Sequence, residues 1–148
     1  PSAVAHFPEE RLHELASDAS IIRHGAKIKS VQENANWFLR VADDYGSFGM
    51  MVGNWPATDY FSLLEKMKKE GTRLSGTTGQ YFLRFMGVPS FIGSASVEAA
   101  LKHAGVIDKA LSTKSAQRAA QEACNRWMEE SGRSLTIISR VLALSTDA

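Results

Sequence analysis

The stretch Leu64–Gly87, LEKMKKEGTRLSGTTGQYFLRFMG, decides the fold that this sequence predicts. Its first apolar segment stops at Gly71, a short polar loop follows, and a second apolar segment opens at Gly76 and runs to Met86. Glycine often ends one helix and permits the tight turn that precedes the next. The pattern therefore predicts two helices joined by a glycine-bounded hairpin, at about residues 60–87.

The start of the second helix has the composition of a phosphate-binding site. The first N–H groups of a helix lack partners within it and carry the positive end of the helix dipole, and glycine there lets a phosphate approach closely. No Asp or Glu occurs between Gly71 and Val97. The candidate phosphate contacts are Arg73, Ser75, Gly76, Thr77, Thr78 and Gly79. On these features alone, a capped turn between two core helices explains the pattern equally well.

Two segments resemble signatures of the DNA-3-methyladenine glycosylase I family. Residues 71–81, GTRLSGTTGQY, are similar to the hairpin of that family, and residues 21–28, IIRHGAKI, with Asn34 and Ala35 are similar to its other signature. The likeness covers residues 1–108 well and the remainder loosely. It implies an all-helical helix-hairpin-helix fold that binds double-stranded DNA, flips out an alkylated purine and hydrolyses its N-glycosidic bond in base excision repair.

A second group of cations precedes the long apolar pattern that follows. Arg23, Lys27 and Lys29 lie close together in the sequence, and no acidic residue intervenes between Asp18 and Glu33. A solvated helix start is the more common role of such a group, whereas a DNA interface would use it to contact phosphates. With the resemblance taken into account, Arg23 and Lys27 are the predicted second DNA contact.

Composition sets the outer limits of the interpretation. A chain of 148 residues with 44% hydrophobic content suffices for one core, so we expect a single helical domain over residues 1–148. The formal net charge is only +1, so DNA binding requires local segregation of charge. Cys124 has no partner for a disulfide, and no apolar run approaches the ~20 residues of a membrane span. We expect no membrane association and a cytoplasmic protein, which the resemblance refines to one associated with the bacterial nucleoid.

The remaining segments also predict helices and no strands, which makes the fold class all-α. A short helix starts at Pro8, and a long, central buried helix runs to about Asp44 with Val31 and Ala35 among its inward residues. Further helices are expected at residues 97–104, 115–130 and 135–144. Residues 46–56, with three glycines and a proline, predict a packed but non-helical linker, and residues 87–96 predict a turn.

The expected catalytic groups of the wider helix-hairpin-helix glycosylase superfamily are missing. Carrying over its spacing places the catalytic Asp at Ser96 and the lysine nucleophile of its lyases near Thr78. A hydroxyl supplies neither a negative charge nor a Schiff base, so we expect no lyase activity and assign no catalytic residue. An N3-alkylated adenine is already cationic and leaves readily, so a pocket that flips and holds it needs less catalytic assistance.

The resemblance also indicates which parts of the family are absent from this sequence. In the family, the pocket carboxylate, its aromatic walls and the wedge residue come mainly from a segment that precedes the matched part. The Cys and His ligands of its zinc site have no counterpart here, so we expect no structural zinc and no cofactor. The base-pocket candidates are Tyr81, Trp37 and Trp55, with Glu33, Asp43 and Asp44 as carboxylates, although each is more typical of core or solvated surface.

Three functional hypotheses stay open at this point. The first is a monofunctional glycosylase for alkylated purines of the 3-methyladenine type. The second is a non-catalytic or truncated helix-hairpin-helix module that binds DNA. The third is an unrelated helical interaction domain whose hairpin is only a capped turn. Strong salt dependence of DNA binding would eliminate the third, because contacts with phosphates release counterions.

Overall fold

A computed structural model describes residues 1–146, and every regular element in that part of the chain is a helix. The all-α prediction is therefore confirmed. The elements are α1 Ser2–Ala5, α2 Glu9–Ser17, α3 Gly25–Tyr45, α4 Phe48–Asn54, the 3-10 turn η1 Ala57–Asp59, α5 Tyr60–Glu70, α6 Gly76–Phe85, α7 Ala95–His103, α8 Lys114–Ser131 and α9 Leu135–Leu144.

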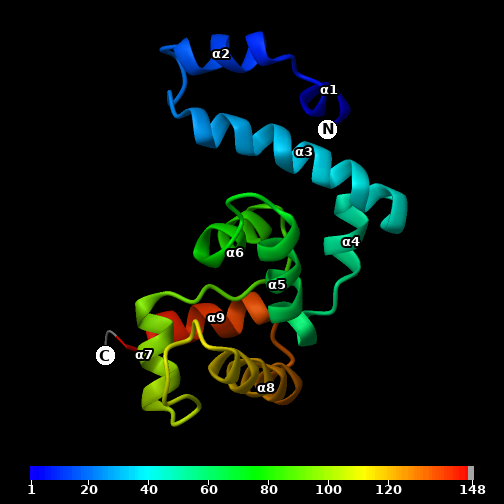
Figure 1. The fold of residues 1–148 in the computed structure, drawn as a ribbon. Helices are drawn as coiled ribbons and strands as arrows, with labels where there is room; N and C mark the ends of the chain where they lie inside the picture. The colour runs from blue at the N-terminus through cyan, green and yellow to red at the C-terminus, as the bar shows by residue number, and fades with distance from the viewer. Residues whose placement is uncertain (147–148) are drawn as a thin grey trace.

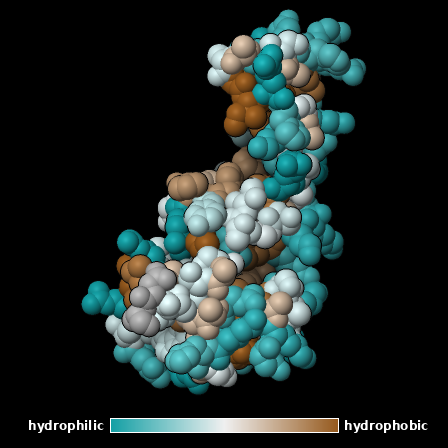
Figure 2. Space-filling model, turned by 90° about the vertical axis from the view of Figure 1, so that its left-hand side faces the viewer, coloured by the Kyte–Doolittle hydropathy of each residue, from teal (hydrophilic) through white to brown (hydrophobic). Residues whose placement is uncertain are grey.

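The N-terminal part of the chain projects from the rest as an arm, residues 1–32. In Figure 1 it lies above the other helices, and Figure 2 shows it as a narrower projection above a broader body. Within the arm, α1 and α2 pack along α3, and α2 has no buried residue. The prediction that α3 is a central buried helix is wrong for this half. Val31 is 58% exposed, whereas Trp37 and Val41 in the second half are enclosed, because only that half packs against the body.

The core of the body surrounds α5, which lies near the middle of the molecule (Figure 1). Tyr60, Leu63 and Met67 place one face of α5 in this core, each at most 1% exposed. An aromatic group joins α3, α4 and α6 above it, and the rings of Phe38 and Phe48 stack with centroids 3.9 Å apart. Burial of these rings anchors the body end of α3.

Residues 46–56 contain a helix, contrary to the sequence-based expectation. Ser47 is the N-cap of α4, and its side chain accepts a hydrogen bond from the N–H of Met50. Phe48, Met51 and Val52 all enter the core. Burial of three large side chains on one helical face outweighs the roughly 1 kcal/mol that each helical glycine costs.

An extended segment, residues 88–93, connects α6 to α7, and we call it the buried strut. The turn predicted for residues 87–96 is wrong, since residues 88–94 form no turn and α7 already begins at Ala95. Ser90 and Phe91 of the strut are fully enclosed. Side chains from three other helices hydrogen-bond its backbone: Tyr60, Gln80, Arg84, Thr136 and Ser139. A segment that lacks regular structure must pair its backbone groups in this way to be buried.

Candidate nucleic-acid interface

The α5–α6 hairpin, residues 60–85, has the two helices and the intervening loop that the sequence predicts. Helix α5 ends at Glu70, and α6 begins at Gly76 with a φ of 60°. The loop packs so closely that neither Gly71 nor Gly79 has room for a side chain. A Cβ on Gly71 would lie 3.0 Å from the Trp37 ring, and one on Gly79 would lie only 2.2 Å from the carbonyl oxygen of Leu74.

The N-terminus of α6 has free hydrogen-bond donors. In α3, α4, α7, α8 and α9, the N-cap side chain accepts a hydrogen bond from the first turn. Ser75 occupies the same position in α6, but its hydroxyl makes no capping bond. Among residues 1–146, no hydrogen bond uses the N–H groups of Gly76, Thr77 or Thr78. Three donors at the positive end of a helix therefore face the surroundings.

Helix α3 holds the start of the loop from the side. The Asn34 side chain donates from Nδ2 to the Thr72 carbonyl at 2.9 Å, and its Oδ1 accepts the Thr72 N–H at 2.8 Å. One turn further on, Trp37 Nε1 donates to the Glu70 carboxylate at 3.1 Å. A second hydrogen bond, from Lys66, is the main cause of the lowered pKa of Glu70. The loop is thus fixed at both Glu70 and Thr72.

Most of the predicted hairpin contacts lie at the surface. Arg73, Ser75, Gly76, Thr77 and Thr78 are all exposed, and the Cβ direction of Gly76 meets no atom within 4 Å. Gly79 is different, because it is buried against the loop. The role of Gly79 as a phosphate contact is therefore corrected to one of packing.

Two arginines of the hairpin have different environments. Arg73 has a φ of 58°, a left-handed conformation that is uncommon outside glycine, and its side chain is exposed. Arg84 is half-buried, and its guanidinium donates to the Ser90 carbonyl and hydroxyl oxygens at 2.6 and 3.2 Å. Burial also lowers the pKa of Arg84. Arg73 is thus the arginine that remains available to an external anion.

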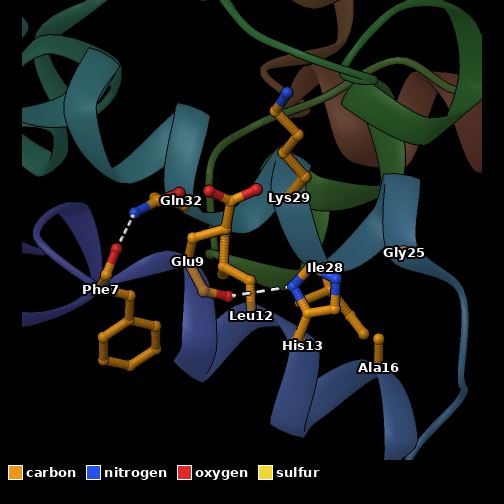
Figure 3. A pocket seen from close by; sticks show the side chains of 9 residues that line it. All are labelled: Phe7, Glu9, Leu12, His13, Ala16, Gly25, Ile28, Lys29 and Gln32. Atoms are coloured by element: carbon orange, nitrogen blue, oxygen red, sulfur yellow. Dashed lines mark hydrogen bonds between the residues drawn. The ribbon is translucent and has the colours of Figure 1, made fainter.

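The second predicted contact lies on the arm. Arg23 and Lys27 are exposed at the start of α3, where His24 Nδ1 accepts the Lys27 N–H. Beside them, α2 and α3 enclose a hollow of about 450 Å³, and Figure 3 shows Lys29 extending away from α2. None of the ion pairs in residues 1–146 involves Arg23, Lys27 or Arg73. These three cations therefore have no carboxylate partner within residues 1–146.

The three aromatic candidates for a base pocket differ in burial and in their contacts. Trp37 is 1% exposed and packs edge-on against Phe48, so its predicted place in an open pocket is wrong. Trp55 is half-buried, and its N–H donates to Asp59 and Ser62 at the junction of α4 and α5, which gives it a packing role. Tyr81 is 46% exposed on α6, so its ring remains accessible.

A cavity of about 360 Å³ lies between α1, α3 and the hairpin. Its lining is apolar except for Asn34, and includes Phe38, Leu74 and Phe82. The candidate carboxylates Glu33, Asp43 and Asp44 do not line it. Sequence reasoning missed both this cavity and the contact of Asn34 with Thr72, because both depend on how α3 packs against the loop.

Ser96 and Cys124 both lie on helices of the body, α7 and α8. Ser96 lies in the first turn of α7, and Ser94, two residues earlier, caps that helix. Cys124 is buried, and burial raises the pKa of its thiol to about 12.

Within residues 1–146, no three His, Cys, Asp or Glu side chains gather in an arrangement that could hold a metal ion. No helix in the same range is long and apolar enough to cross a membrane.

These features define an all-helical protein in which a long helix braces a glycine-bounded helical hairpin against a helical body. Comparison with known families narrows the class of protein further. The family model for methyladenine glycosylase matches residues 1–117, and the chain belongs to that family. No solved structure matches the chain. The family confirms the resemblance seen in the two signature segments.

Proposed function

We propose that this chain binds double-stranded DNA through the α5–α6 hairpin and acts in a monofunctional glycosylase that hydrolyses the N-glycosidic bond of N3-alkylated adenine. The observation that carries the proposal is the start of α6, where three unpaired N–H groups lie beside Arg73 in a segment without carboxylates. A DNA phosphate is the anion that best suits such donors in a chain of the methyladenine glycosylase family, because most protein contacts with DNA are made to phosphates.

The arm would supply a second contact on the same DNA. Lys27 precedes Asn34 by seven positions on α3, which corresponds to about 10 Å along the helix axis. Because Asn34 contacts the hairpin loop, α3 acts as a rod between the two groups of cations. Two phosphate contacts held at a fixed separation by α3 would set the register of the protein on the DNA backbone without reading sequence.

The chemistry of an N3-alkylated base suits a site that supplies little catalysis. Breakage of the bond from C1′ to the base nitrogen releases the cationic base as a neutral molecule, and water adds to C1′ with loss of a proton. The protein must then mainly extrude the nucleotide and hold the base. Tyr81 is the base-pocket candidate whose ring is accessible, and we propose that it stacks on the extruded base.

A second candidate function is that of a DNA-binding module without excision activity. The lining of the cavity beside the hairpin favours it, because its polar residue, Asn34, is engaged with Thr72 and its other walls are apolar. Such a cavity offers no carboxylate to a cationic base or to the sugar. DNA binding without base release would distinguish this module from the glycosylase.

The decisive experiment measures free 3-methyladenine released from alkylated duplex DNA, together with the affinity for the same duplex. Release that depends on protein concentration supports the glycosylase. Salt-dependent binding without release supports the module, and absence of binding at low salt refutes both.

Two variants at Gly76 test the phosphate contact itself. Gly76→Asp places a carboxylate at the free donors, and Gly76→Asn is the uncharged control of the same shape. Both residues tolerate the left-handed conformation better than most, and the site has room for either. We expect the Asp variant to weaken DNA binding at least tenfold more than the Asn variant, and equal affinities would exclude this contact.

A further inference from the structure

We infer that Asn34 is a positioning residue that sets the hairpin loop in its DNA-binding conformation. The inference rests on the proposed function, because it concerns the same hairpin. Asn34 lies on α3 and touches none of the predicted phosphate contacts through a hydrogen bond. It acts through the backbone of Thr72, which precedes Arg73.

The chemistry of the contact selects an amide. Thr72 presents one donor and one acceptor, its N–H and its carbonyl, and both are satisfied by the two ends of a single side chain. A primary amide carries a donor and an acceptor side by side, whereas an ionised carboxylate carries acceptors alone. Asp at this position would therefore keep the bond from the Thr72 N–H and place an oxygen against the Thr72 carbonyl.

The loop needs such a restraint because its backbone is strained. Arg73, next to Thr72, has a φ of 58°, and non-glycine residues keep this conformation where neighbouring structure enforces it. On the other side of Thr72, Gly71 faces the Trp37 ring so closely that an added Cβ would lie only 3.0 Å from it. Asn34 and Trp37, one turn apart on α3, thus fix residues 70–72 from one face.

The restraint reaches the phosphate donors through one further contact. Leu74 is buried, and its carbonyl lies against Gly79 of α6 at a distance that leaves no space for a Cβ. Residues 72–74 therefore determine where α6 begins relative to α5. A loop held in this way before DNA arrives avoids part of the ordering entropy of binding.

The test measures the affinity of the chain for a fluorescein-labelled duplex with an abasic-site analogue. We expect Asn34→Ala to raise Kd about tenfold, which corresponds to the loss of a restraint of two hydrogen bonds. Asn34→Asp should raise Kd at least as much. The matched control is Asn36→Ala, since Asn36 donates to Gln32 and Ala5 on the same helix and not to the hairpin. We expect that variant to stay within twofold of the unsubstituted chain.

A double-mutant cycle separates positioning from general destabilisation. If Asn34 acts through the α6 donors, Asn34→Ala has little further effect once Gly76→Asp has removed the phosphate contact. Its effect should still appear in a Lys27→Ala background, because the arm contact does not involve the loop. Full additivity with Gly76→Asp would overturn the inference.

Hydrogen exchange of backbone amides provides a readout without DNA. Asn34→Ala should speed exchange at Thr72 and in the loop while the second half of α6 keeps its protection. Unchanged exchange at Thr72, or an unchanged Kd with faster exchange, would overturn the inference. If the unsubstituted chain does not bind DNA at low salt, the proposed function fails first and the role of Asn34 in binding fails with it.

Discussion

Replacement of Gly79 by alanine should destabilise the protein, although the same change stabilises most helices. Gly79 lies within α6, where alanine is normally favoured over glycine by about 1 kcal/mol. The added Cβ would lie 2.2 Å from the Leu74 carbonyl oxygen and 3.1 Å from the Leu74 carbonyl carbon. Both are backbone atoms, so relief requires movement of the hairpin loop away from α6.

The magnitude follows from the difference between these two effects. Forcing an extra carbon into a packed site typically costs about 1–3 kcal/mol, and a contact this short with backbone belongs at the upper end. After the gain in helix propensity, we expect a net loss of about 2 kcal/mol in the free energy of unfolding. For a chain of this size, that lowers the melting temperature by roughly 4–8 °C.

Thermal and urea unfolding followed by circular dichroism measure the change. The control is Gly53→Ala in α4, since a Cβ there meets no atom within 4 Å. That variant should be as stable as the unsubstituted protein or more so, by up to about 1 kcal/mol. A Gly79→Ala protein that melts at or above the unsubstituted one would refute the close packing of the hairpin.

Three other outcomes follow from individual contacts. The hydrogen bond from Lys66 lowers the pKa of Glu70 from its ordinary value of 4.5, so the stabilisation is fully present above pH 4.5 and is lost as the pH falls through the lowered pKa. The melting temperatures of Glu70→Gln and the unsubstituted protein should therefore differ above pH 4.5 and converge as the pH is lowered further. Tyr60→Phe removes the buried bond to the Phe91 carbonyl and should lower the free energy of unfolding by about 1–3 kcal/mol in urea titrations. Cys124 should react with a thiol reagent at pH 8 only on unfolding, because burial raises the pKa of its thiol to about 12.

Local signals predicted the helices well where capping and packing agree. Helix α9 spans the residues predicted for it, with Ser134 as its N-cap, and α8 extends the predicted range by one residue at each end. Helix α4 was missed because its glycines weigh against a helix locally, whereas burial of Phe48 in the core depends on distant residues. The buried strut was missed for the same reason, since several of its partners lie on α5 and α9, far away in the sequence.

The sequence indicated which residues form the candidate site, but it did not indicate how those residues are arranged in space. Glycine punctuation and the absence of acids located the α5–α6 hairpin, yet they could not show that Gly79 serves packing while Gly76 faces outward. Trp37 was a reasonable pocket candidate by residue type. Its position against Gly71 depends on the approach of α3 to the loop, which neither segment encodes alone.

The buried strut has a consequence for where the chain can be shortened. The family model ends at residue 117, yet Thr136 and Ser139 of α9 accept the strut's Ser90 and Ile92 N–H groups. A protein cut after residue 117 would leave these donors orphaned inside a core that had lost two helices. We therefore expect the C-terminal helices to unfold together with the matched region, and a protein trimmed at the family boundary to be less soluble than the full chain.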